Sequence, residues 1–208
     1  MGTYADLRAR IEGDINRSDI TTDIQKAINR AIEHYEKERF WFNENTWTFS
    51  TSAGGETIAF ASASVSDMLT MDEVTLTRSS TDIYPLEQKT IQELRDINTA
   101  GTSTQGPPTI FAIFNDTFYF YPVPDTAYTV TIYGQKSYAA LSASADTNDF
   151  TTEAEDLIES RARAWVYSRK LRNYEAAAAS KTEEMEALAA LREKTINLLG
   201  TGKIRSRD

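Results

Sequence analysis

A short segment in the middle of the chain, residues 109–121, constrains the fold more than any other because its pattern predicts a β-hairpin. It has two runs of aromatic and β-branched residues on either side of Asn115 and Asp116, with the sequence TIFAIFNDTFYFY. Such residues favour strands, and a short polar pair between them is typical of a tight turn. We expect strands at residues 109–114 and 117–121, the second ended by Pro122 and Pro124.

Successive side chains along a strand point to opposite faces of the sheet. Phe118 and Phe120 therefore lie on one face of the predicted hairpin, and Tyr119 and Tyr121 lie on the other. A sheet that is apolar on both faces has to be covered on both. We expect the cover to be the protein's own core together with a neighbouring subunit, with Trp47 in the same set of core or intersubunit aromatic residues.

The segments around the hairpin also favour strands. Residues 46–51 and 74–78 alternate, Gly54 and Gly55 mark a turn, and residues 56–60 suit a strand returning from it. Residues 90–97 are spaced as a short helix. Residues 128–134 follow the hairpin closely and predict the third strand of an antiparallel meander.

Both ends of the chain have the period of helices. Near the N-terminus, Thr22 followed by Gln25 resembles a capping box, and an apolar stripe continues from it to residues 40–42. Near the C-terminus, Thr151 or Thr152 is expected to cap a helix, and an alanine-rich helix ends at Gly200.

These patterns predict an α+β protein, a helical bundle from the N- and C-terminal helices with an inserted antiparallel β domain. The helical domain comprises residues 1–42 and 151–199, the β domain residues 43–150, and an extended arm residues 200–208. The arm is basic and contains Lys203, Ile204, Arg205 and Arg207. We expect Ile204 to anchor it on a partner and the three cations to pair with acidic groups there.

Composition excludes several classes of chemistry. The chain has 208 residues, no cysteine and a single histidine, His34, so thiolate catalysis and cysteine- or histidine-rich metal sites are excluded. No apolar run approaches the ~20 residues needed to span a bilayer, so no membrane partner is expected. The net charge of −9 argues against duplex DNA as a tightly held ligand.

Carboxylate pairs are the remaining candidates for catalysis, as in a glycan hydrolase. Asp116 and Asp125 lie at the ends of the hairpin, and Glu153, Glu155 and Asp156 lie at the start of a helix. Turn and helix-start positions explain all five residues without catalysis. Residues 143–150, with the sequence ASADTNDF, lack the spacing of a calcium-binding loop. No catalytic, cofactor-binding or metal site is therefore assigned.

A carbohydrate-binding module is the second alternative. It would present an exposed, coplanar pair of rings among Trp47, Tyr119, Tyr121 and Tyr133. Single-stranded nucleic acid also stacks on aromatic residues, but binding sheets interleave basic residues with them. Residues 109–135 contain neither lysine nor arginine, which disfavours nucleic acid.

An ordered series of short motifs resembles the phage adaptor proteins of the head-to-tail connector. The series covers about residues 84–180 and runs PL at 85–86, GPP at 106–108, PVPD at 122–125, LS at 141–142, DTND at 146–149 and TEAED at 152–156. The resemblance implies a helical bundle with an inserted β domain. It implies a structural role with no enzymatic activity and no cofactor.

The resemblance also implies partners. Such proteins assemble as a ring, commonly dodecameric, beneath the portal, with a tail or nozzle protein below and DNA passing through without specific binding. In related connectors the C-terminal segment reaches the portal, which here is the arm at residues 200–208. The expected location is the neck of the virion, and the host cytoplasm during assembly.

Overall fold

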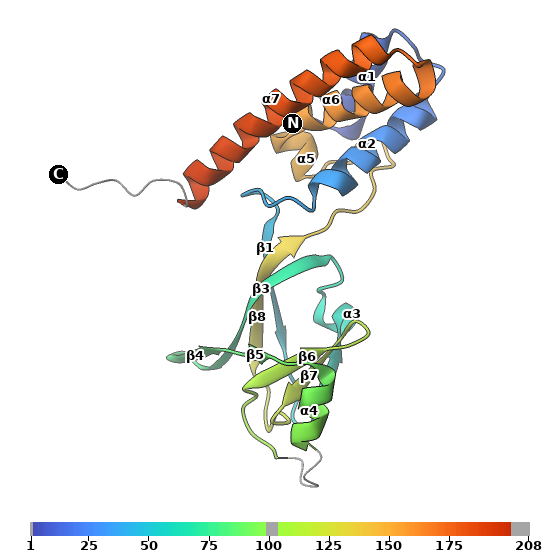
Figure 1. Ribbon diagram of the computed structural model, residues 1–208. Coiled ribbons are helices and arrows are strands. Elements are labelled where there is room, and N and C mark those ends of the chain that lie inside the picture. Colours follow the sequence, from blue (N-terminus) through green and yellow to red (C-terminus); the bar gives the residue numbers. More distant parts are fainter. Residues whose placement is uncertain (1, 99–103, 201–208) are drawn as a thin grey trace, which may run out of the picture. The chain divides into compact units, whose positions relative to one another are not determined.

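The computed structural model describes residues 2–98 and 104–200, which form two compact units (Figure 1). The helical unit comprises the chain up to Asn43 and from Ser137 onward, and the β unit comprises Glu44–Lys136. The chain thus has the expected α+β class, with helices from both ends and an insertion rich in antiparallel strands.

The helical unit is a bundle in which α6 packs against α1, α2 and α7. Its elements are α1 (Tyr4–Ile15), α2 (Thr21–Tyr35), α5 (Asp149–Glu153), α6 (Glu155–Val166), a π-helical turn (Tyr167–Leu171) and α7 (Tyr174–Leu199). The apolar stripe predicted for α2 is buried in this bundle: Ile24, Ala27, Ile28, Ala31, Ile32 and Tyr35.

The predicted capping box at Thr22 and Gln25 is wrong. Helix α2 begins at Thr21 after Ile20, which provides no side-chain cap. Gln25 instead donates from Nε2 to the Leu141 carbonyl oxygen, 3.2 Å away. The helix also ends at Tyr35, short of residues 40–42. Local spacing suggested a cap, but a long-range contact uses the glutamine side chain.

Asn29 shows why the helical unit extends to Ser137, although the sequence suggested residue 150 as the end of the β domain. The Leu141 backbone N–H donates to Asn29 Oδ1 at 2.8 Å, and Asn29 Nδ2 donates to the Leu141 carbonyl at 3.0 Å. Leu141 is buried in the core of the bundle. These irregular residues carry no helical period, so their attachment to α2 is invisible in the sequence.

The helix starts near the C-terminus differ partly from expectation. Asn148, rather than Thr151 or Thr152, caps α5: its Oδ1 accepts from the Thr151 backbone N–H at 3.0 Å. Asn173 caps α7, and Gly200 ends it with a φ of 68°, a conformation that glycine adopts readily. The end of the alanine-rich helix at Gly200 is therefore confirmed.

The β unit contains two four-stranded sheets. The first has the order β1-β8-β3-β4, with β1 (Glu44–Ser50), β8 (Thr129–Lys136), β3 (Met68–Ser79) and β4 (Asp82–Pro85), all antiparallel. The second has the order β2-β7-β6-β5, with β2 (Thr57–Ala59), β7 (Thr117–Tyr121), β6 (Ile110–Ile113) and β5 (Glu87–Gln88). Two short helices, α3 (Phe60–Ala63) and α4 (Ile91–Asn98), complete the unit.

The hairpin is confirmed as β6 and β7, joined by a two-residue turn. Asn115 and Asp116 both have positive φ angles, 50° and 52°, as the twist-compatible hairpin turn requires. The predicted meander is wrong, however, because β8 lies between β1 and β3 in the other sheet. The strand after Gly54 and Gly55 also pairs with β7 and not with β1. The alternation of apolar and polar residues shows which side chains share a face of a strand, but it does not predict which strand pairs with it.

Candidate assembly surfaces

The aromatic residues of the hairpin divide between the two faces of the sheet. Phe118 and Phe120 are buried in the core of the β unit, where the ring centroids of Phe118 and Phe49 lie 5.5 Å apart. Trp47 is also buried there and donates from Nε1 to Asp67 Oδ1 at 2.9 Å. These rings stabilise the interior of a single subunit.

Tyr119 and Tyr121 lie on the opposite face and remain half-exposed. Helix α4 contacts both β6 and β7, and its Leu94 is buried, as is Ala112, the strand partner of Tyr119. Trp47 lies in the core and is not available as an exposed ring. Among the residues that the structure describes, no ring contact joins Tyr119, Tyr121 and Tyr133 to one another. The geometry does not favour a carbohydrate platform.

The candidate catalytic carboxylates have structural partners. Asp125 Oδ1 accepts from the Tyr128 hydroxyl at 2.5 Å, and Asp116 occupies the hairpin turn. Glu153 pairs with Lys194 at 3.1 Å. Within residues 2–98 and 104–200, no group of three histidine, aspartate or glutamate side chains is placed to hold a metal ion.

Glu155 and Asp156 lie in the first turn of α6, as the sequence suggested for them. Glu155 Oε1 pairs with Arg10 Nη2 at 3.0 Å, which ties α6 to α1. Asp156 is exposed in the same turn, where a carboxylate favours the positive end of the helix dipole. Glu155 therefore helps to hold the bundle together, and Asp156 favours the start of α6.

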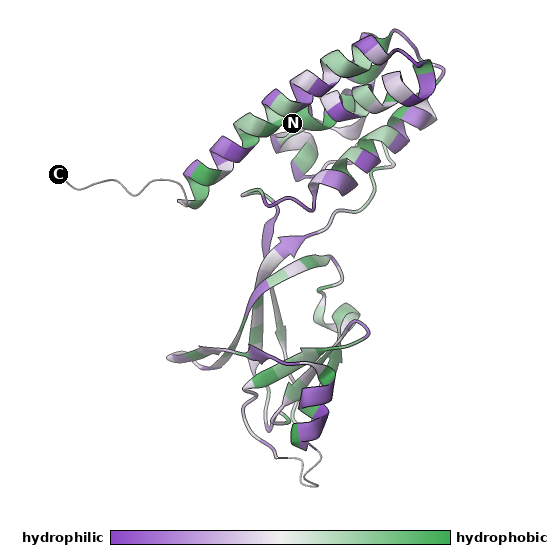
Figure 2. Cartoon of the chain, in the orientation of Figure 1, coloured by the Kyte–Doolittle hydropathy of each residue, from purple (hydrophilic) through white to green (hydrophobic). Residues whose placement is uncertain are grey.

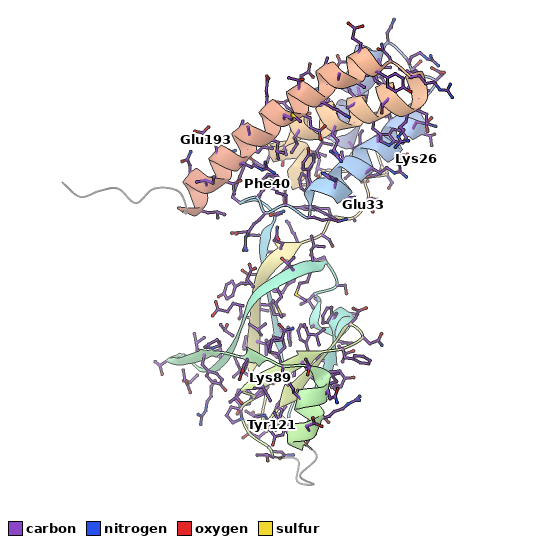
Figure 3. The ribbon with its side chains drawn as sticks, in the orientation of Figure 1. Lys26, Glu33, Phe40, Lys89, Tyr121 and Glu193 are labelled. Atoms are coloured by element: carbon purple, nitrogen blue, oxygen red, sulfur yellow. The ribbon has the colours of Figure 1, made fainter. Side chains whose placement is uncertain are left out.

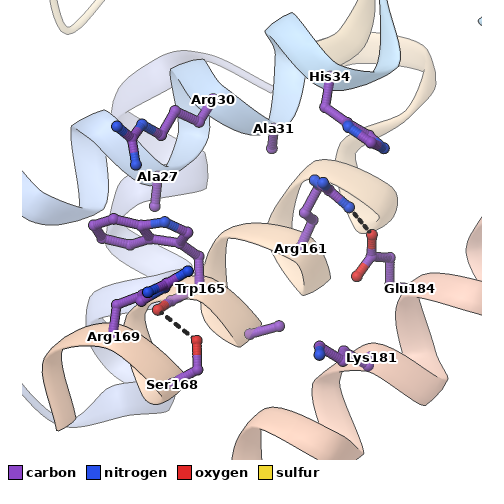
Figure 4. A pocket seen from close by; sticks show the side chains of 11 residues that line it. Ala27, Arg30, Ala31, His34, Arg161, Trp165, Ser168, Arg169, Lys181 and Glu184 are labelled. Carbon is purple, nitrogen blue, oxygen red and sulfur yellow. Dashed lines mark hydrogen bonds and ion pairs between the residues drawn. The ribbon is translucent and has the colours of Figure 1, made fainter. Parts of the chain in front are cut away.

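A basic cleft lies between α2, α6 and α7 in the helical unit (Figure 4). We use this name for the hollow of about 350 Å³ that is lined by Ala27, Arg30, Ala31, His34, Arg161, Ala164, Trp165, Ser168, Arg169, Lys181 and Glu184. The lining has four cationic side chains and one carboxylate. Such an excess is notable in a chain whose net charge is −9.

A buried hydrogen-bond network holds one wall of the basic cleft. Glu184 Oε1 accepts from the Tyr35 hydroxyl and from Arg161 Nη1, each at 2.5 Å, and the Arg161 guanidinium carbon lies 5.1 Å from the Tyr35 ring centroid. Burial and the bonded Glu184 carboxylate raise the pKa of Tyr35, so the phenol stays protonated as the donor. The one carboxylate of the cleft lining thus pairs with Arg161.

Three cations of the cleft, Arg30, Arg169 and Lys181, form no ion pair with the residues that the structure describes. Arg30 lies over the indole of Trp165, 5.5 Å from the ring centroid. This contact orients the guanidinium without neutralising its charge. The cleft therefore has unused positive charge beside an aromatic surface.

Loss of hydration lowers the pKa of His34, and the charge of Arg161 lowers it further. The imidazole is therefore neutral at pH 7 and adds no charge to the basic cleft. His34 is exposed on α2.

Sequence reasoning missed the basic cleft. Arg161, Trp165 and Arg169 recur every four residues on one face of a helix, and this spacing was the available signal. The arm predicted to contact the portal, Lys203, Ile204, Arg205 and Arg207, lies outside the described residues. No described helix is long and apolar enough to cross a membrane.

The chain thus combines helices from both of its ends with an inserted β unit, the organisation that its resemblance to phage adaptors implied. The family model described as SU10 adaptor protein matches residues 2–205, so the chain belongs to this family of phage head-tail adaptors. A search of curated proteins gives no match.

Proposed function

We propose that this protein forms a ring that links the portal to the tail and continues the DNA channel in the neck of the virion. The observation that carries this proposal is the match to a phage adaptor family across both the helical and the β unit. Its function would then be assembly of the connector, without turnover of a substrate.

The end of α7 supports a docking role for the C-terminal region. Leu198 is 59% exposed, and Leu199 is also exposed. Large apolar side chains that remain in water are a common mark of an interaction surface. They immediately precede the basic arm in the sequence. The apolar end of α7 and the charged arm could therefore bind the portal together as one continuous segment.

The acidic character of the chain suits passage of DNA. A wall that repels phosphates would let DNA slide, whereas a basic wall would hold it. We therefore propose that DNA traverses the ring without specific binding. A ring whose lumen is lined by lysine and arginine would contradict this part of the proposal.

Purified protein mixed with portal rings tests the main proposal, with electron microscopy of the particles as the measurement. We expect a layer of density on one face of the portal. Deletion of residues 200–208 should abolish attachment, as should the change of Lys203, Arg205 and Arg207 to glutamine. The far-ultraviolet circular dichroism of both variants should match that of the natural chain.

A chain that never attaches to the portal would overturn the proposed function. Retained attachment after the deletion would overturn only the role of the arm. The glycan-hydrolase alternative predicts cleavage of cell-wall substrate in a zymogram, and we expect none.

A further inference from the structure

The outer face of α7 bears two parallel stripes that the bundle does not use. Tyr174, Met185 and Ile196 are spaced by eleven residues, close to three full helical turns, and are 70%, 71% and 46% exposed. We call these three residues the apolar stripe. They extend over about 33 Å, at a rise of about 1.5 Å per residue, and Lys181 and Arg192 lie between them on the same side of the helix. Figure 2 shows hydrophobic and hydrophilic residues alternating along this helix.

Beside the apolar stripe lies an acidic one, formed by Glu175, Glu186 and Glu193. These positions are eleven and seven residues apart, so they also share one face. All three side chains are exposed and form no ion pair with described residues. The residues of α7 that are buried in the bundle, which include Glu184 and Leu191, lie on the opposite side of the helix. Figure 3 shows Glu193 pointing away from the bundle.

We infer that this acidic ridge, with its apolar stripe, binds the basic cleft of a second copy of the chain. The inference rests on the proposed ring. Arg30, Arg169 and Lys181 in the cleft lack carboxylate partners, and Glu175, Glu186 and Glu193 on the ridge lack cationic ones. Trp165 in the cleft offers the apolar stripe a surface to cover.

Electrostatics favours a second copy as the occupant. Copies with a net charge of −9 repel one another, so a lateral contact has to bring opposite charges together locally. The basic cleft and the acidic ridge belong to the same helical unit but to different faces of it. A contact between two different surfaces of identical subunits is head-to-tail, and repetition of such a contact closes a ring when the rotation permits.

The basic arm does not compete for the cleft in this scheme. Lys203, Arg205 and Arg207 have the same sign of charge as the cleft, so they suit a different, acidic partner. One chain would therefore have separate surfaces for its neighbours in the ring and for the portal.

Charge reversal tests the contact. Two variants reverse one side each, Glu186→Lys with Glu193→Lys on the ridge and Arg30→Glu with Arg169→Glu in the cleft. Each should weaken self-association at least about tenfold, because like charges then meet. The measurements are sedimentation of the free protein and the number of copies bound to portal rings. All four changes in one chain should restore assembly, since they exchange the signs on both sides of every contact.

Glu33→Lys and Lys26→Glu on α2 are the matched controls. Both side chains are exposed and outside the ridge and the cleft lining, as Figure 3 illustrates, and they change the net charge equally per residue. These controls should assemble as the natural chain does. Thermal unfolding of every variant establishes that its fold is retained.

The outcomes separate the inference from the proposed function. Suppose that the natural chain assembles but the variant with all four changes does not recover the self-association that the ridge and cleft variants lose. The inferred contact is then wrong, and the proposed ring is unaffected. The same holds if only the cleft variant is impaired, as would occur if the cleft bound DNA or the portal. If the natural chain associates neither alone nor on portal rings, both are overturned.

Discussion

Glu184 on α7 accepts a hydrogen bond from Tyr35 on α2 at 2.5 Å, and the same oxygen accepts from Arg161 on α6 at the same distance. Helices that are distant in the sequence thus meet at one carboxylate, which is itself buried. A buried carboxylate is stable only while its charge is paired and hydrogen-bonded, so this group couples the N-terminal and C-terminal helices.

Replacing Arg161 with methionine should destabilise the protein by about 1–3 kcal/mol, because it leaves the Glu184 carboxylate with the phenol alone. The value is below that of a fully buried pair, since the Arg161 side chain is 32% exposed. Urea unfolding measures the change. Adding Glu184→Gln should recover part of the loss. The control Arg17→Met breaks the exposed pair with Asp19 and should leave stability unchanged.

The single histidine reports on the same region. We expect His34 to titrate below the ordinary value of about 6.5, because hydration is lost there and Arg161 is close. Nuclear magnetic resonance of the imidazole protons measures this pKa directly. Arg161→Met should raise it, since the nearby carboxylates Glu184 and Glu38 then act unopposed by that cation. A pKa at or above 6.5 in the natural chain would contradict the structure.

The lowered pKa of His34 also has a consequence for stability. The folded chain favours the neutral imidazole, so the contribution of this group is present above the unfolded pKa of about 6.5 and is lost as the pH falls through the folded pKa. Stability should therefore decline as the pH falls below about 6.5, and His34→Gln should flatten this part of the profile.

Gly134 on β8 is required by the backbone of β3. A Cβ at this position would lie 2.0 Å from the Thr70 carbonyl oxygen, beside a shift in the register of the two strands. Gly134→Ala should destabilise the protein by about 1–3 kcal/mol, the usual cost of forced overpacking. Thermal unfolding provides the measurement.

Gly13 in α1 is the control position for the substitution of Gly134. No atom lies within 4 Å of the Cβ that alanine would add there. Gly13→Ala should stabilise the protein by about 0.4–1 kcal/mol, because alanine has less freedom to lose on folding. Equal effects of the two substitutions would mean that the close approach of Thr70 is not present in solution.

Phe118 and Phe114 allow a buried and an exposed phenylalanine to be compared within one hairpin. Phe118 is fully buried, whereas Phe114 is 53% exposed. Phe118→Ala should cost about 3–5 kcal/mol through lost burial and a cavity, and Phe114→Ala should stay within about 0.5 kcal/mol. Chemical denaturation compares the two. Similar losses would show that the second ring is also covered in the folded protein.

Much of the local structure could be predicted from the sequence. The hairpin follows from two runs of strand-forming residues around Asn115 and Asp116, and α7 follows from its alanine-rich composition and Gly200. Periodicity records which side chains of an element are apolar, so element type and buried face are local properties. The adaptor family was likewise recognisable from an ordered series of short motifs.

Tertiary structure alone decided which elements meet. Strand β8 pairs with β1 and β3, not with the adjacent hairpin, because alternation specifies faces and leaves the partner to packing across the whole unit. The basic cleft combines Arg30 with Arg169 and Lys181, which are more than a hundred residues away in the sequence. Contacts over such separations depend on how the helices pack together, and no local pattern of residues encodes that arrangement.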